Sequence, residues 1–132
     1  MVSFKIVSRN LERSVKFYKD ALGYDNQMPE QNGVKVRLDE NNYLKLEDVG
    51  AKEILRSTEI PREISEALDK GRLGAGVIIG LHVPDADETY AKIESMGGKI
   101  VRKLISSPDE IGFVCKDPDG YVLAIHSHPH GH

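Results

Sequence analysis

The chain has 132 residues, of which 39% are hydrophobic and 30% charged. This supplies enough apolar material for one packed domain, or for two small repeated halves that share a core, and it excludes disorder as the main state. Its 18 basic and 21 acidic residues give a formal net charge of −3. Such a near-balance does not favour a nucleic acid or an anionic membrane as a partner.

The single cysteine, Cys115, excludes an intrachain disulfide and a cysteine-based zinc site. We expect it in the core, because free cysteine usually behaves as a small hydrophobe. No apolar run approaches the roughly 20 residues that span a bilayer. The N-terminus also lacks the apolar segment of a signal peptide. These features predict a cytoplasmic protein.

The chain opens with a strand followed by a helix. Residues 2–7 are rich in β-branched side chains and alternate with a period of two, which is typical of a half-buried strand. Apolar side chains then recur at helical spacing over residues 11–22. Asn10 is the expected N-cap of this helix and Gly23 its C-terminal stop.

The next segments predict an antiparallel hairpin with one buried face. Residues 34–38 and 43–47 both alternate apolar with polar or charged side chains, and an Asn-Asn turn separates them. From residue 50 the pattern loosens, and residues 63–70 predict a short helix after Pro61.

The second half repeats the order of the first. A strand at residues 77–83 precedes a helix at 86–96, and three further strands are expected at 99–104, 111–115 and 121–126. A shift of 75 residues places Asn10 on Asp85 and Gly23 on Gly98. Two copies of one βαβββ module are therefore predicted, each too small to bury its sheet alone.

Three motifs carry a family resemblance. Asn-Leu-Glu-Arg-Ser-Val-Lys-Phe-Tyr at residues 10–18, with Ala-Leu-Gly-Tyr at 21–24, resembles the first helix of the glyoxalase/bleomycin-resistance/dioxygenase (vicinal oxygen chelate) superfamily. Residues 71–77 resemble its glycine-rich linker, and Lys-Asp-Pro-Asp-Gly-Tyr at 116–121 resembles the turn before its last strand. The match extends to about residue 126.

The resemblance implies an α+β fold in which two βαβββ modules form curved mixed sheets around a ligand cavity. We expect a single domain over residues 1–126, with module one at 1–49, a linker at 50–75 and module two at 76–126. A histidine-rich tail follows at 127–132. Chains of this size in the superfamily commonly form homodimers, and the resemblance implies the same here.

In metal-dependent members of the superfamily, each module gives one ligand from its first strand and one from its last. Counting from the helix motif, these positions fall here on Ser3, Lys45, Ile78 and Ala124. An ammonium has no lone pair to offer a cation, and Ile78 and Ala124 offer no ligand atom. We therefore predict no metal ligands at the usual positions and no cofactor.

Strand alternation places further side chains on the inward faces of the two sheets. The first sheet is net basic there, and the second carries two histidines. The candidate ligand-binding residues are Lys5, Arg37, Lys45, Glu47, His82 and His126. For each of them a structural role is the alternative: a solvated face for Arg37, an ion pair for Lys45 with Glu47, and a hydrogen-bonded strand end for His82.

A displaced metal site is a competing hypothesis. Glu47 and His126 are equivalent in the two modules, and with His82 they would supply two imidazoles and a carboxylate for a divalent metal ion. The tail contributes three more histidines, which could bind metal at the surface.

We expect a small-molecule-binding protein that sequesters a drug or metabolite, with an anionic or carbonyl-rich ligand favoured by the basic inward face. The alternative is a metal-dependent lyase, isomerase or dioxygenase of the same superfamily. Fold alone cannot choose between them, because function depends on the site.

Overall fold

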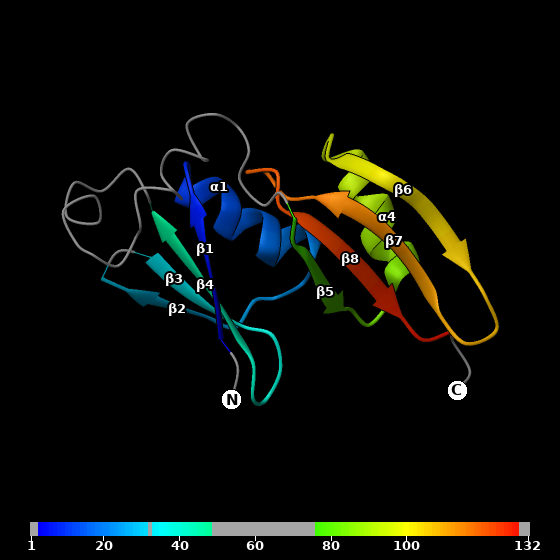
Figure 1. Cartoon of the computed structure of the whole chain (residues 1–132), viewed down its shortest axis with the longest axis horizontal. Helices are drawn as coiled ribbons and strands as arrows, with labels where there is room; N and C mark the ends of the chain where they lie inside the picture. Colours follow the sequence, from blue (N-terminus) through cyan, green and yellow to red (C-terminus); the bar gives the residue numbers. More distant parts are fainter. Residues whose placement is uncertain (1–2, 32, 49–75, 130–132) are drawn as a thin grey trace. The chain divides into compact units, whose positions relative to one another are not determined.

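The computed structural model describes residues 3–31, 33–48 and 76–129. The predicted linker and the predicted helix at 63–70 lie outside these residues. The chain forms two compact units, residues 1–73 and 74–132, and each is described by itself. Each unit contains a strand, a helix and three more strands (Figure 1). The predicted α+β class and the two βαβββ modules are therefore confirmed.

The first unit is a four-stranded mixed sheet in the order β1-β4-β3-β2, in which β1 runs parallel to β4 and the other neighbours are antiparallel. Its elements are β1 (Ser3–Ser8), α1 (Leu11–Lys16), the π-helix η1 (Phe17–Ala21), β2 (Gln27–Glu30), β3 (Gly33–Arg37) and β4 (Tyr43–Asp48).

The second unit repeats this topology in the order β5-β8-β7-β6, with β5 parallel to β8. Its elements are β5 (Ile78–His82), α4 (Ala86–Ser95), β6 (Lys99–Ser106), β7 (Ile111–Lys116) and β8 (Val122–Ser127). Strand β8 thus ends at Ser127, whose Oγ accepts a buried hydrogen bond from the backbone N–H of Ala86 at 2.9 Å. This bond ties the start of α4 to the sheet.

The two helices begin in the same way. The side chain of Asn10 accepts the N–H of Arg13 at 3.1 Å, and that of Asp85 accepts the N–H of Glu88 at 3.1 Å. Both residues have extended backbone angles, as N-caps do. No helix among the described residues is long and apolar enough to cross a membrane.

The helix predicted at residues 11–22 differs in its second half, where a π-helical turn replaces the α-helix. There the N–H of Leu22 donates to the carbonyl oxygen of Phe17, five residues earlier, at 3.3 Å. The neighbouring rings of Phe17 and Tyr18 are both buried and meet edge to face, with centroids 5.5 Å apart. Apolar periodicity predicts a helix here but does not distinguish the wider turn.

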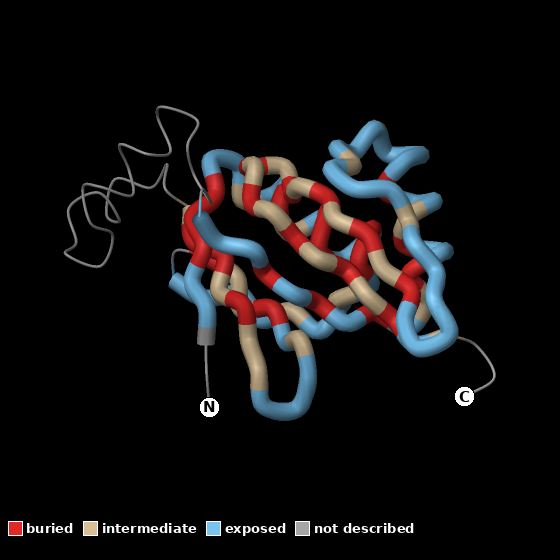
Figure 2. The backbone as a smooth tube through the Cα atoms, turned by 45° about the vertical axis from the view of Figure 1, so that its right-hand side comes forward, coloured by how far each residue is buried: buried red, intermediate tan, exposed pale blue. Residues whose placement is uncertain are grey.

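Each sheet buries one face against its own helix. Leu44 and Leu46 on β4 are buried on the α1 side, and Leu123 and Ile125 on β8 are buried on the α4 side. Figure 2 shows the resulting alternation of buried and half-buried residues along the strands. The alternate side chains project from the opposite face of each sheet.

Cys115 lies on the buried side of β7 and is 0% exposed, which confirms its predicted place in the core. Burial raises the pKa of its thiol to about 12, and the nearby Asp117 carboxylate adds to the rise. Since the thiolate is the reactive form, burial and the raised pKa both disfavour reaction of this thiol at neutral pH.

Candidate functional site

Three lysines form a row across the first sheet, on the face opposite α1. Lys45 on β4 is in register with Lys5 on β1 at one side and with Lys35 on β3 at the other. We call Lys5, Lys45 and Lys35 the lysine row. Cross-strand neighbours of this kind have their Cβ atoms about 5 Å apart, so like charges in a row repel unless something compensates them.

Glu47 compensates part of this charge. Its Oε1 atom lies 3.2 Å from Lys5 Nζ and 3.1 Å from Lys45 Nζ. The Glu47 side chain is only 2% exposed, whereas those of Lys5 and Lys45 are 40% and 32% exposed. Its second oxygen, Oε2, is buried and accepts no hydrogen bond in the described part of the chain. A buried carboxylate oxygen without a partner is unusual and costs stability.

The third lysine has a different partner. Lys35 Nζ lies 4.2 Å from the centroid of the Tyr43 ring, which is a cation–π contact and leaves the charge itself uncompensated. The lysine row with Glu47 therefore carries three positive charges and one negative charge.

Arg37 stands apart from this cluster. Its exposed guanidinium donates from Nε to the backbone oxygen of Asp39 at 3.0 Å, at the turn between β3 and β4. The Asp39 carboxylate accepts hydrogen bonds from Asn41 and Asn42, and the side-chain bond from Asn42 is the main cause that lowers its pKa. These contacts organise the turn. A ligand-binding role for Arg37 stays a prediction.

The two predicted histidines of the second unit are neighbours. His82 on β5 and His126 on β8 are in register, and their rings meet edge to face with centroids 5.4 Å apart. The ring of His128 also lies near that of His82, at a centroid distance of 5.5 Å. The Nδ1 atom of His126 is 3.6 Å from Glu110 Oε1, an ion pair when the imidazole is protonated.

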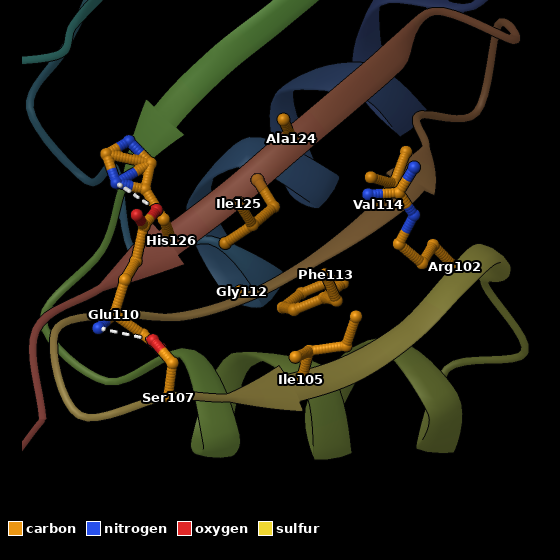
Figure 3. A pocket seen from close by; sticks show the side chains of 10 residues that line it. All are labelled: Arg102, Ile105, Ser107, Glu110, Gly112, Phe113, Val114, Ala124, Ile125 and His126. Carbon is orange, nitrogen blue, oxygen red and sulfur yellow. Dashed lines mark hydrogen bonds and ion pairs between the residues drawn. The ribbon is translucent and has the colours of Figure 1, made fainter.

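A pocket of about 290 Å³ lies beside His126 in the second sheet (Figure 3). Its volume is just below the roughly 300 to 1,000 Å³ of typical small-molecule sites. Side chains and backbone of three neighbouring strands and of the β6–β7 turn surround it. The lining residues include Arg102, Ile105, Glu110, Gly112, Val114 and Ala124, together with His126.

Three of the four residues at the positions where the resemblance implies metal ligands do not fit a metal ion. Lys45 presents an ammonium that is paired with Glu47, Ile78 is an apolar side chain that is 69% exposed, and Ala124 ends in a methyl group. Among the described residues, no group of three or more His, Cys, Asp or Glu side chains is arranged to hold a metal ion.

Alternation placed Lys5, Lys45 and Glu47 together, and it placed His82 beside His126. It did not reveal Arg102 or Glu110 as pocket residues. Register shifts interrupt the pairing of β6 with β7 on both sides of Arg102, so a period of two does not predict its direction there. Glu110 lies in the turn before β7, where no periodicity applies.

The comparisons with known proteins agree with this topology. The profile of the Glyoxalase/Bleomycin resistance protein/Dioxygenase superfamily matches residues 1–125. The chain belongs to this superfamily. A search of the curated proteins gives no significant match.

Among solved structures, a glyoxalase/bleomycin resistance protein from Albidiferax ferrireducens T118 is 16% identical, with a TM-score of 0.67 over 98% of each chain. The hypothetical protein SA1046 from S. aureus is 22% identical, with a TM-score of 0.68 over 96% of this chain and 92% of that one. A glyoxalase/bleomycin resistance protein/dioxygenase from Alicyclobacillus acidocaldarius is 16% identical, with a TM-score of 0.57 over 97% and 90%. At these identities the likeness shows the fold alone. The homodimer stays a prediction.

Proposed function

We propose that this protein binds a small, oxygen-rich anion on the lysine row without a metal ion, and that it acts by sequestering a metabolite or drug. The observation that carries the proposal is the pairing of Lys45 with Glu47. Lys45 stands where metal-dependent relatives have a ligand, and its Nζ is 3.1 Å from Glu47 Oε1. The Lys45 ammonium thus supplies positive charge at the position where those relatives have a metal ligand.

The contacts of Glu47 also disfavour the metal-dependent alternative. A displaced site would need Glu47 as its carboxylate ligand, but Oε1 already faces two ammonium groups. A divalent cation brought to that oxygen would be repelled by both lysines. The same two lysines attract an anionic ligand, because each keeps a substantial part of its side chain exposed.

Matched probes test the charge preference. Succinate, succinamide and putrescine have similar lengths but are anionic, neutral and cationic, and their binding is measured by isothermal titration calorimetry. We expect succinate to bind best. Replacing Lys45 with methionine keeps most of the stem and removes the charge, so succinate affinity should fall by about tenfold or more, the scale of a lost charged hydrogen bond.

Two further variants serve as controls. Lys45→Arg keeps the positive charge and should retain most of the affinity. Lys92→Met removes an exposed lysine of α4, which pairs with Glu88 on its own helix, and should leave succinate binding unchanged. Preferential binding of putrescine, or equal succinate affinity in the protein and in Lys45→Met, would show that the lysine row is not the anion site.

A further inference from the structure

The pocket of the second unit is built from two rows of side chains on the sheet face opposite α4. In one row Arg102 is in register with Val114, and Val114 with Ala124. In the next row Ile105 is in register with Gly112, and Gly112 with His126. The two rows are offset by two positions along β7, which corresponds to about 7 Å along a strand. A molecule the size of one six-membered ring spans that distance.

The base of the pocket is apolar and is formed by residues with small side chains. Gly112 and Ala124 present almost no side chain, and Val114 and Ile105 provide apolar walls. A methyl group on Gly112 would lie 3.1 Å from the Ile125 carbonyl oxygen, so the neighbouring strand leaves little room for a side chain at this position. Such a floor accepts the flat apolar body of a ligand.

The two ends of the pocket differ in chemistry. At one end Arg102 carries an exposed guanidinium that makes no hydrogen bond or ion pair with the described residues. At the other end Glu110 faces His126, and Ser107 fixes the turn through hydrogen bonds with the backbone of Glu110 at 3.0 and 3.1 Å (Figure 3). The guanidinium is suited to a carboxylate, which it can bind with two parallel hydrogen bonds.

We propose that this pocket is a binding site for an organic monocarboxylate with a ring-sized apolar body and a hydroxyl group at its far end. The carboxylate pairs with Arg102, the ring lies over Gly112 and Ala124, and the hydroxyl reaches the His126–Glu110 pair. The negative charge of Glu110 repels a carboxylate from that end, so the ligand has one orientation. This pocket lies in the second unit, whereas the lysine row lies in the first.

Three probes test the assignment in the full chain by isothermal titration calorimetry. They are para-hydroxybenzoate, benzoate without the hydroxyl, and para-hydroxybenzamide without the charge. We expect para-hydroxybenzoate to bind best. Arg102→Met should weaken it by about tenfold or more, because a charged hydrogen-bonding partner is lost. The matched control Lys103→Met removes an adjacent exposed charge outside the pocket and should leave the affinity unchanged.

A second pair of variants tests the body and the far end of the ligand. His126→Leu should remove the preference for para-hydroxybenzoate over benzoate. Ala124→Leu should fill the floor and weaken both carboxylates. Equal losses of para-hydroxybenzoate affinity in Arg102→Met and Lys103→Met would show that general electrostatics, and not a contact with Arg102, causes the effect. That result would overturn the assignment.

Absence of para-hydroxybenzoate binding to the unaltered protein would also overturn it. The outcome is distinguishable from failure of the proposed function, because succinate binding to the lysine row is tested by Lys45→Met. Lys45→Met should bind para-hydroxybenzoate as the unaltered protein does. If Lys45→Met and not Arg102→Met abolishes that binding, the aromatic acid binds the first unit and the pocket assignment is wrong.

Discussion

Replacing Gly33 with alanine should lower the free energy of unfolding by about 3 kcal/mol, the upper part of the range for overpacked sites. A Cβ atom at Gly33 would meet the backbone carbonyl oxygen of Leu46. Gly33 lies on β3, and Leu46 lies on β4 between β1 and β3, so a shift of that carbonyl disturbs the pairing on both sides. Urea unfolding followed by circular dichroism measures the loss.

Gly80→Ala is the matched control. Gly80 also lies within a strand, β5 at the edge of the second sheet, but a Cβ atom there has nothing within 4 Å. We expect its stability to change by no more than about 0.5 kcal/mol. Equal losses in the two variants would mean that the close contact at Gly33 does not determine the effect.

Replacing both lysines that pair with Glu47 should also lower the free energy of unfolding. In the double variant Lys5→Met/Lys45→Met, a carboxylate that is 2% exposed loses both of its ion-pair partners. Breaking a buried pair by removing one side typically costs about 3–5 kcal/mol, because the remaining charge is desolvated without compensation. Either single variant leaves one ammonium beside Oε1 and should lose less. Chemical denaturation measures the free energy of unfolding of the two single variants and of the double variant.

A triple variant separates this cause from lost packing. Adding Glu47→Leu to the double variant removes the uncompensated charge and the partnerless oxygen, so most of the lost stability should return. A triple variant that is no more stable than the double variant would contradict the electrostatic explanation. It would show instead that the lysine stems stabilise the sheet by packing.

Local sequence signals predicted the helices and strands whose formation depends on residues close together in the chain. The helix starts at Asn10 and Asp85 follow from capping chemistry within three residues, and alternation predicted the hairpin of β3 and β4. Strand β2 was not located, because the segment Gln27–Glu30 has Met28 as its one large apolar residue, contains Pro29 and lies at the sheet edge. Its place depends on pairing with β3, which is a tertiary contact.

The candidate sites also have one part that follows from the sequence and one part that does not. Side-chain direction along β1, β4 and β8 follows from a period of two, which brought Lys5, Lys45 and Glu47 to one face. The partner of each charge does not follow from periodicity. The pocket of the second unit depends on irregular pairing at Arg102 and on the turn at Glu110, so it emerged only from the structure.

Metal-independent binding is tested most directly by titrating succinate into the full chain with and without EDTA, after replacing the tail histidines His128, His130 and His132 with asparagine. Metal content is measured on the same sample. We predict much less than one tightly bound divalent ion per chain and the same succinate affinity in both titrations. One bound ion per chain that is lost in Glu47→Ala, together with succinate binding that EDTA abolishes, would contradict the account and favour the metal-dependent enzyme.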